Sequence, residues 1–359
     1  MSLAQLASID ARRICIIKPS ALGDIVQSLP LLGPLRARFP EAQISWVANR
    51  GLSGLLADHP DLSDVIPFDR QGGLRQGWRL LRQLRAARFD MVIDLQGLLR
   101  TGIMCAVTRA PLRIGLQTAR EGAGFSYNVT LADTGRDMPA YARYWRVAEA
   151  FGVGAHPRKL QLPIADADVS AAARLLDGLP RPLIAVHPGA QWITKRWPTE
   201  SFAHVASAVM AGYSAGVVVL GSGDEMELAG DVVSRIEDLQ GSDRHVRNLA
   251  GQTSLKQLAA VVRSVDLVLS NDSGPMHLAA ELGTPVVGVF TCTDPSRSGP
   301  PVGEHVLVAS RVACAGSYQK TCPHHGSEQM ACLRELSPQR VLNAVRTVIE
   351  RNDSHARLA

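Results

Sequence analysis

A strand-to-helix turn within residues 267–290 carries the polar residues with the clearest chemical potential. An apolar run ends there, and Ser273 follows in the position of a helix N-cap. Asp272 precedes this residue, and Gly274 and His277 follow it. Backbone N–H groups at a helix N-terminus bind phosphate. The stretch predicts a strand–helix–strand unit with an anion site at its turn, although an ordinary capped helix explains it equally well.

The stretch 187–198, HPGAQWITKRWP, combines two cations with two tryptophans. Its glycine permits a close approach of the backbone. Lys195 or Arg196 is placed to neutralise a diphosphate. The alternative interpretation is a pair of surface charges beside packed tryptophans.

An acidic segment, GSGDEME, follows a further apolar run at 221–227. Glu225 is placed to bind a pair of ribose hydroxyls, with Glu227 as the second choice. Acidic residues are also common in the first turn of a helix, because they interact favourably with its dipole. The basic loop, the acidic loop and the helix N-terminus together favour a nucleotide diphosphate.

The N-terminal half offers one candidate base. A buried-type strand at 13–17 leads into a turn that ends with Asp24. Ligands of parallel sheets bind beyond the carboxyl ends of the strands, so Asp24 is placed to act as a general base, or else it caps the helix that follows. The turn lacks the G-x-G-x-x-G fingerprint of dinucleotide-binding proteins.

Two further polar residues belong to the same half. Gln96 stands at the end of the buried-type run 91–97, and Arg120 lies in the loop-rich stretch 113–128. Arg120 is suited to an acidic acceptor, or to a surface pair with Glu121.

Apolar runs alternate with helical patterns through both halves of the chain. This alternation predicts an α/β protein with two doubly wound parallel-sheet domains facing each other across a cleft. We expect the domains at 1–175 and 176–336. Residues 337–359 are expected to form a closing helix that packs back towards the N-terminal domain.

Composition restricts the classes of partner. The chain has 359 residues, 46% of them hydrophobic, and a formal net charge of +5. This small excess favours anionic ligands or an anionic membrane surface over nucleic acid. No apolar run approaches the ~20 residues of a membrane span, and the N-terminus does not resemble a signal peptide.

An arginine-rich helix is predicted over residues 74–89. One side is expected to be lined by Leu74, Trp78, Leu81 and Leu84, and the rest of the helix is crowded by Arg75, Arg79, Arg82, Arg85 and Arg88. A solvated face is the simpler interpretation. The alternative is a face that meets anionic lipid headgroups.

The six cysteines are scattered, which suggests a reduced, cytosolic protein. Cys314, Cys322 and Cys332 lie near two histidines, but their spacing is not that of the C-x-x-C pairs of a typical zinc site. Plain thiols are therefore favoured over a metal site.

Five motifs, taken in order, closely resemble the bacterial lipopolysaccharide heptosyltransferases of glycosyltransferase family 9. They are KPSALGDIVQSLP, DLQGLLRT, TAREGAGFSYN, HPGAQWITKRWP and NDSGPMHLAAELGTP. The resemblance covers nearly the whole chain. It implies a GT-B fold and an inverting transfer that uses neither a metal nor another cofactor. The implied donor is ADP-L-glycero-β-D-manno-heptose, and the implied acceptor is the Kdo-lipid A inner core at the cytoplasmic side of the inner membrane.

The resemblance also implies roles for individual residues. Asp24 matches the base, Lys195 matches the lysine that stabilises the departing diphosphate, and Arg120 matches an arginine that meets a Kdo carboxylate. The remaining donor contacts are Gln191, Arg196, Glu225, Asp272, Ser273, Gly274 and His277. The remaining acceptor contacts are Ser20, Gly23 and Gln96.

The motifs divide between two types within the family. The stretch TAREGAGFSYN resembles the enzyme that adds the first heptose. Ala190 and Gln191 stand where that enzyme often has hydroxyl residues, which favours the type that adds the second heptose. Another sugar, a protein acceptor or a nucleotide-sugar-binding protein without catalysis are the alternatives.

Overall fold

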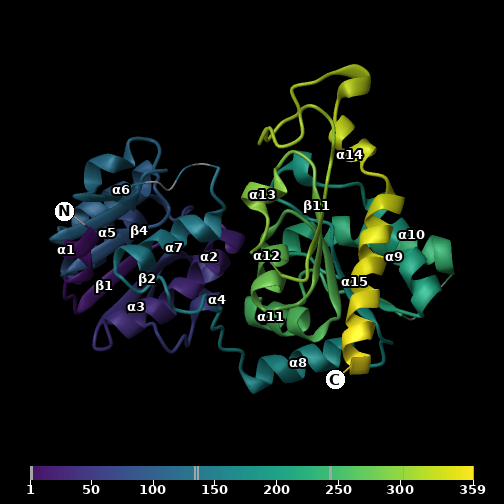
Figure 1. The fold of residues 1–359 in the computed structure, drawn as a ribbon, viewed down its shortest axis with the longest axis horizontal. Helices are drawn as coiled ribbons and strands as arrows, with labels where there is room; N and C mark the ends of the chain where they lie inside the picture. The colour runs from purple at the N-terminus through teal and green to yellow at the C-terminus, as the bar shows by residue number, and fades with distance from the viewer. Residues whose placement is uncertain (1–2, 133–134, 136, 242–244, 302, 359) are drawn as a thin grey trace. The chain divides into compact units, whose positions relative to one another are not determined.

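The computed structural model describes residues 3–132, 135, 137–241, 245–301 and 303–358 (Figure 1). The chain divides into two compact units, Met1–Pro163 and Ile164–Ala359, called unit 1 and unit 2 below. Each unit is built on one six-stranded parallel sheet. The predicted doubly wound α/β architecture is confirmed in both.

The sheet of unit 1 has the order β3-β2-β1-β4-β5-β6. Its strands are β1 (Arg13–Ile17), β2 (Gln43–Asn49), β3 (Asp64–Phe68), β4 (Met91–Asp94), β5 (Leu112–Leu116) and β6 (Val129–Leu131). Its helices are α1 (Leu3–Ala7), α2 (Leu22–Ser28), α3 (Leu32–Arg38), α4 (Arg50–Leu56), α5 (Gly73–Ala86), α6 (Leu99–Thr108) and α7 (Ala140–Ala150), with 3-10 turns η1 (Leu29–Leu31) and η2 (Ala123–Ser126). Pro30 lies in η1, the short turn that separates α2 from α3.

The sheet of unit 2 has the order β12-β11-β10-β7-β8-β9. Its strands are β7 (Leu183–His187), β8 (Gly216–Val219), β9 (Val246–Asn248), β10 (Leu267–Asn271), β11 (Val286–Phe290) and β12 (Val306–Ala309). Its main helices are α8 (Asp166–Leu176), α9 (Thr199–Tyr213), α10 (Met226–Gln240), α11 (Leu255–Ser264), α12 (Gly274–Glu281) and α15 (Pro338–Leu358). Short turns complete the unit: η3 (Ile193–Lys195), η4 (Gly223–Glu225), α13 (Pro295–Ser298), η5 (Gly326–Glu328) and α14 (Ala331–Glu335).

Both sheets follow one topological rule. When each unit is numbered from its own first strand, both sheets have the order 3-2-1-4-5-6. In this order the direction of winding reverses between the first and fourth strands, and ligands bind beyond the carboxyl ends at that point. The reversal points are β1/β4 in unit 1 and β7/β10 in unit 2.

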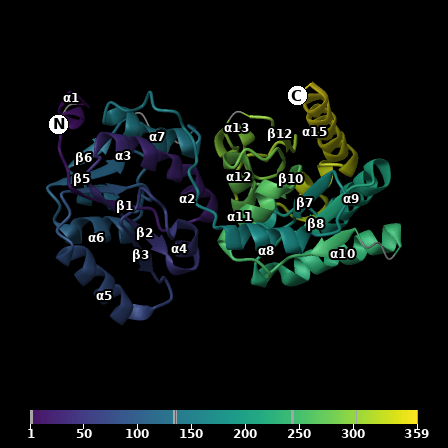
Figure 2. The same ribbon diagram turned by 90° about the horizontal axis from the view of Figure 1, so that it is seen from below.

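Helices cover both faces of each sheet. In unit 1, α5 and α6 pack on the face that contains Cys15 and Ile17, and Figure 2 shows α3 and α7 on the other face. In unit 2, β7 directs Ile184 and Val186 to a core shared with α9, α10 and α15. The alternate residues of this strand face α8, α11 and α12. The one polar residue of β7 is therefore His187, at the carboxyl end of the strand.

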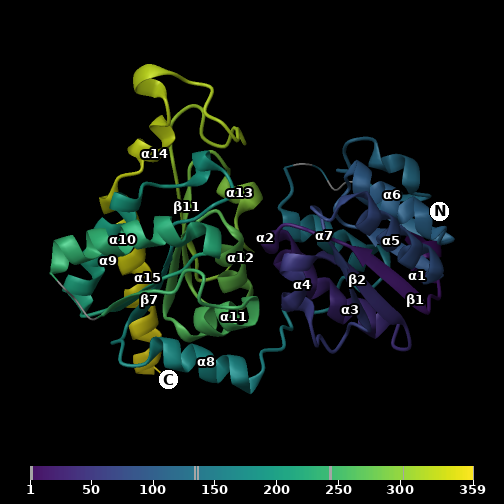
Figure 3. The ribbon, with the colours of Figure 1, turned by 180° about the vertical axis from the view of Figure 1, so that it is seen from behind.

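The domain boundary lies earlier than the sequence predicted. It falls between positions 163 and 164 rather than between 175 and 176. The reason is that α8 packs against α11 of unit 2. The C-terminal helix α15 lies along α9 and against β10, β11 and β12 (Figure 3), so its buried face belongs to the core of unit 2 rather than to the N-terminal domain as expected.

Two local expectations for unit 1 need correction. Residues 113–116, expected in a loop, form β5 between β4 and β6. In α5 the packed stripe is centred on Leu80 and Leu84, whereas Leu74 and Trp78 are 86% and 65% exposed. The side of α5 that carries Leu80 and Leu84 packs against the core of unit 1, and the side that carries Leu74 and Trp78 faces solvent.

The packing of α15 predicts a stability effect in unit 2. Ile349 is 3% exposed within this core, so Ile349→Ala should lower the free energy of unfolding by about 3 kcal/mol. Urea unfolding followed by circular dichroism measures the change. Arg346→Ala, an exposed position on the same helix, is the matched control. Equal effects of the two substitutions would contradict the packing described.

Candidate active site

The reversal point of unit 2 brings the two predicted donor loops together. Strands β7 and β10 are neighbours, and their register pairs His187 with Ser270. The loop that carries Lys195 follows β7, and the turn that carries Asp272 and Ser273 follows β10. The two loops therefore leave the sheet side by side.

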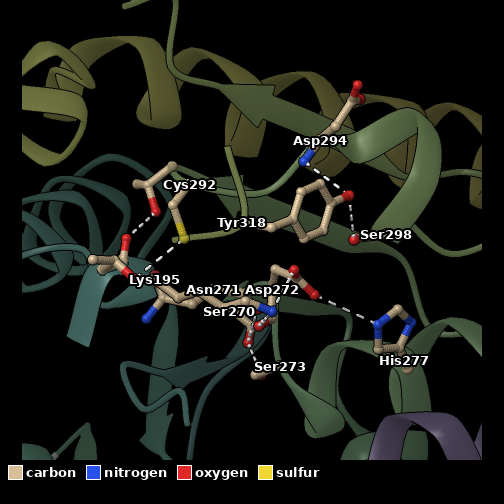
Figure 4. Close-up of polar contacts among 12 residues, drawn as sticks. Lys195, Ser270, Asn271, Asp272, Ser273, His277, Cys292, Asp294, Ser298 and Tyr318 are labelled. Atoms are coloured by element: carbon tan, nitrogen blue, oxygen red, sulfur yellow. Dashed lines mark hydrogen bonds and ion pairs between the residues drawn. The ribbon is translucent and has the colours of Figure 1, made fainter. Parts of the chain in front are cut away.

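Asp272 lies between Lys195 and His277 (Figure 4). Its Oδ2 atom is 2.7 Å from Nζ of Lys195, and its Oδ1 atom is 3.6 Å from Nε2 of His277. Burial alone would raise the pKa of Asp272, but the hydrogen bond with His277 and the charge of Lys195 outweigh it and lower the pKa to about 2. The site therefore holds an ionised carboxylate beside a lysine ammonium.

The loop around Lys195 is fixed from several sides. Asn271 donates from Nδ2 to the carbonyl of Pro188 at 2.7 Å and accepts from the N–H of Trp197 at 3.1 Å. The ammonium of Lys195 lies over the ring of Trp192, 4.8 Å from its centroid. Asn271, which is buried, was not identified as a site residue from the sequence. The available signal was its position as a polar residue at the end of an apolar run.

A buried histidine connects the acidic loop with the helix N-terminus. His187 places Nδ1 3.1 Å from Oγ of Ser273 and Nε2 3.5 Å from Oε2 of Glu225. The hydrogen bond from His187 is the largest cause that lowers the pKa of Glu225 to about 2. A Cβ at Gly189 would lie 2.0 Å from Oε1 of Glu225, so the close approach predicted for this glycine is made by Glu225.

Ser273 occupies the predicted N-cap position of α12, which begins at Gly274. Its hydroxyl makes no capping hydrogen bond. The hydroxyl instead lies 2.9 Å from Oγ of Ser270 and 3.1 Å from His187. The N–H groups of the first turn of α12 are therefore not capped by this side chain.

Three other residues predicted to contact the donor either make hydrogen bonds within their own loops or are exposed. Glu225 also accepts hydrogen bonds from the backbone and side chain of Ser222, so it serves as a helix-start residue as well. Arg196 donates from Nε to the carbonyl of Ala190 at 2.8 Å, within its own loop. Gln191 is exposed. Donor contacts by these three residues stay predictions.

In unit 1, Asp24 lies in the first turns of α2 and is paired on several sides. Its Oδ2 is 3.3 Å from Nζ of Lys18 and accepts from the N–H of Ala21 at 3.3 Å, while Oδ1 accepts from the hydroxyl of Tyr144 at 2.8 Å. Burial acts to raise its pKa, but Lys18 and these hydrogen bonds lower it. The side chain is 35% exposed, so an ionised carboxylate remains open to a substrate.

The residues that contact Asp24 were not predicted from the sequence. Lys18 is 2% exposed at the end of β1, and a buried ammonium requires a counter-charge, which was a usable signal. Burial lowers the pKa of Lys18, Asp24 opposes this effect, and the nearby cation Arg143 adds to it. Tyr144 and Arg143 lie on α7, more than a hundred positions from Asp24, and no sequence pattern linked them to it.

The other acceptor-side residues lie at adjacent strand ends. Gln96 follows β4 and accepts from the N–H of Ser20 at 3.3 Å, and Gly23 lies buried in α2. The N–H of Arg120 donates to the carbonyl of Gly97 at 2.7 Å. A Cβ at Gly97 would lie 2.9 Å from Cα of Ala119, so only glycine permits this approach of the loops.

The side chain of Arg120 is available to a ligand. It is exposed and makes no ion pair within the described part of the chain. The expected alternative partner, Glu121, accepts instead from the N–H of Leu99 at 3.2 Å, at the start of α6.

The cysteine-rich segment supports the lysine loop. Thr194 donates to the carbonyl of Gln319 at 2.7 Å and accepts from Sγ of Cys292 at 3.3 Å. Burial raises the pKa of Cys332 to about 11, so this thiol is neutral at physiological pH. The cysteines at 314, 322 and 332 are free thiols. Among the residues described, no group of three or more His, Cys, Asp or Glu side chains is arranged to hold a metal ion.

Comparison with known proteins gives a consistent result. The family model "Glycosyltransferase family 9 (heptosyltransferase)" matches residues 77–327. Lipopolysaccharide core heptosyltransferase OpsX of Haemophilus influenzae is 30% identical over 291 residues, covering 80% of this chain and 82% of the relative. Lipopolysaccharide heptosyltransferase 1 of Pseudomonas aeruginosa is 26% identical over 368 residues, covering 94% and 98%. The structure of E. coli ADP-heptose LPS heptosyltransferase II has a TM-score of 0.74 and 25% identity, covering 95% and 99%.

The environment of Asp272 predicts a pH dependence of stability. Its pKa in the folded chain, about 2, lies below the ordinary value of 3.8. The carboxylate therefore contributes stability above about pH 4 that is lost as pH falls towards about 2, in total about 2 kcal/mol. Asp272→Asn should remove this part of the acid sensitivity. Urea unfolding between pH 6 and pH 3 measures it, with exposed Asp238→Asn as control. An unchanged acid dependence in Asp272→Asn would count against the ion pair.

Proposed function

The chain belongs to glycosyltransferase family 9, and from this premise we propose that it transfers L-glycero-D-manno-heptose from ADP-heptose to the Kdo-lipid A inner core of lipopolysaccharide. One observation carries the proposal. The neutral pair of Lys195 and Asp272 stands beside the uncapped N-terminus of α12, a site suited to a sugar diphosphate.

The donor would be bound by unit 2. Lys195 has ammonium protons left after its contact with Asp272, and they suit the β-phosphate. The N–H groups at Gly274 and beyond suit the same diphosphate. Glu225, held ionised beside His187, suits the ribose hydroxyls.

The acceptor would be bound by unit 1. Arg120 offers an exposed guanidinium, and Arg143 and Lys18 add positive charge around Asp24. A cationic surrounding suits the carboxylates of Kdo. It suits a neutral sugar acceptor less well.

The reaction would be a single displacement with inversion. Asp24 takes the proton of the acceptor hydroxyl as its oxygen forms a bond to the anomeric carbon. The bond between that carbon and the β-phosphate oxygen breaks, and ADP leaves with its electron pair. Lys195 and the N-terminus of α12 stabilise the charge that develops on the diphosphate. We propose that these groups suffice without a metal ion or another cofactor.

Two candidate activities are compatible with this proposal: addition of the first heptose or of the second heptose of the inner core. The relatives include enzymes named heptosyltransferase 1 and heptosyltransferase II. The stretch 118–128 favours addition of the first heptose, whereas Ala190 and Gln191 favour the second type. We propose the first type, acting in the cytoplasm at the surface of the inner membrane.

Release of ADP from ADP-heptose tests this function. We expect release with Kdo₂-lipid A and none with an acceptor that already carries one heptose. The opposite result would assign the second heptose. Release with neither acceptor, in folded protein that binds ADP-heptose, would reject the proposed acceptor. EDTA should leave the rate unchanged, and inhibition reversed by one added metal would contradict the metal-free mechanism.

The role of Asp24 gives a second prediction. Asp24→Asn should lower the rate of ADP release by about 10²–10⁴-fold, the usual contribution of a general base. ADP-heptose affinity, measured by calorimetry, should stay within about twofold because the donor contacts belong to unit 2. Asp64→Asn, an exposed position at the amino end of β3, is the matched control. A folded Asp24→Asn protein that loses donor binding would contradict this role.

A further variant tests whether Asp24 acts as a base or has only a structural role. Tyr144→Phe removes one of the hydrogen bonds that lower the pKa of Asp24. The acidic limb of the kcat/KM profile should therefore move to higher pH, since activity is lost as pH falls through this pKa. A structural role alone would leave the limb in place.

A further inference from the structure

Positive charge is concentrated in one segment of unit 1. Between positions 70 and 89 the chain has six arginines and no acidic residue. The formal net charge of the whole chain is +5, so the other residues together are net negative by one. Helix α5 spans most of this segment. The basic character of the protein therefore belongs to this one segment, with four of its arginines on α5, rather than to the surface as a whole.

The exposed side of α5 also carries large apolar side chains. Leu80 and Leu84 are buried against the sheet. Leu74 and Trp78, four positions apart and therefore on one side of the helix, are 86% and 65% exposed. The exposed side of α5 thus presents a leucine and a tryptophan to solvent.

The arginines around these apolar residues are not engaged elsewhere. Arg75, Arg79 and Arg82 are exposed, and none forms an ion pair within the described ranges. Their helix has 14 residues, which at ~1.5 Å per residue gives a length of about 21 Å. A flat polyanionic surface would meet several of the guanidinium groups at once.

Further exposed apolar residues lie on the elements next to α5. Helix α6 packs beside α5, and η2 packs on α6 (Figure 2). Leu99 and Ile103 on α6 are 45% and 41% exposed, and Phe125 in η2 is 63% exposed. Leu99 donates its N–H to Glu121, the residue next to Arg120. Exposed apolar residues therefore also occur on α6 and η2, beside the loop of the proposed acceptor arginine.

We propose that the surface formed by Leu74, Arg75, Trp78, Arg79 and Arg82, here called the α5 surface, docks on an anionic phospholipid bilayer. The arginines bind lipid phosphates, while Trp78 and Leu74 enter the headgroup region. Each arginine near an anionic leaflet contributes on the order of 1 kcal/mol, or about fivefold in partitioning. Nucleic acid would use the arginines but gives exposed leucine and tryptophan no apolar phase to enter.

This docking deepens the proposed function and rests on it for its purpose. An acceptor anchored by lipid A lies in a bilayer, and docking along α5 would bring unit 1, which carries Arg120, to that bilayer. Within the chain described, no helix is long and apolar enough to span a membrane. Docking along a surface is the mode of attachment that the α5 residues support.

Co-sedimentation with sucrose-loaded vesicles that contain no lipopolysaccharide tests the inference. The full chain should bind vesicles of phosphatidylglycerol and phosphatidylethanolamine, and bind phosphatidylcholine weakly. The triple substitution Arg75→Gln, Arg79→Gln, Arg82→Gln should reduce partitioning on the order of 100-fold. The pair Leu74→Ser, Trp78→Ser should reduce it about tenfold or more.

Matched controls lie on unit 2. Arg174, Arg263 and Arg346 are exposed, and their joint replacement by Gln removes the same charge. Leu239, 54% exposed, provides an apolar control as Leu239→Ser. Both control proteins should bind vesicles within about twofold of the parent chain. Equal losses in control and α5 variants would overturn the inference, because net charge alone would then explain binding.

Two outcomes separate this proposal from its rivals. Tighter binding to duplex DNA than to vesicles, unaffected by the Leu74 and Trp78 substitutions, would overturn it in favour of nucleic acid. ADP release with a de-acylated, water-soluble Kdo acceptor should be unchanged by the α5 variants. Vesicle binding without ADP release would reject the proposed function alone, and ADP release without vesicle binding would reject the docking alone.

Discussion

The burial of charge at the ends of parallel strands is the constraint on which both units depend. Helices cover both faces of each sheet, and the charged groups of the two candidate sites stand beyond the carboxyl ends of β1, β7 and β10. Asp272 is 5% exposed there, and an unpaired carboxylate so deeply buried would be strongly unfavourable. Lys195 and His277 satisfy it. The same requirement applies in reverse in unit 1, where Asp24 satisfies the buried ammonium of Lys18. The charged side chains proposed for binding and catalysis are thus the same side chains whose burial requires a partner of opposite charge.

Pairing has a consequence for how an anion binds to unit 2. The charges of Lys195 and Asp272 cancel, so this pair alone has little net attraction for a diphosphate. For the proposed donor, the attraction would come from the N–H groups at the start of α12, whose N-cap hydroxyl is turned towards His187 and Ser270 instead of capping them. The ion pair instead fixes the position of the Lys195 ammonium, because Asp272 and Trp192 orient this side chain in the absence of a ligand. Preorganised groups of this kind need no rearrangement as charge develops on a leaving group.

The sequence was sufficient for the architecture because apolar runs and helical periods alternate through both halves, and the turn residues around Asp24 and Ser273 mark the strand ends. It did not reveal that both sheets share one strand order, because that order depends on pairings between strands far apart in the chain. Strand β5 and helices α6 and α7 were not predicted, nor was the hydrogen bond from Tyr144 of α7 to Asp24. From the sequence, His187 and Asn271 could be recognised only as polar residues at the ends of strands, without their hydrogen-bond partners. Side-chain partners across loops arise from tertiary contact, which local patterns do not encode.

The two departures from the family pattern, Ala190 and Gln191, lie in the lysine loop. Their effect on the leaving group is limited, because Lys195, Asp272, Ser273 and His277 are all present and interconnected in unit 2. Loss of two hydroxyls removes possible phosphate donors but leaves the ion pair and the helix N-terminus in place. Under the proposed function, discrimination between acceptors would then arise mainly in unit 1, where Lys18 and Arg143 lie close to Asp24 and Arg120 is exposed on a loop. Gly97 fixes one of these positions, since it lets the loop of Arg120 lie directly against the end of β4. The choice of acceptor would therefore depend on residues after β1, after β5 and on α7 rather than on the donor site.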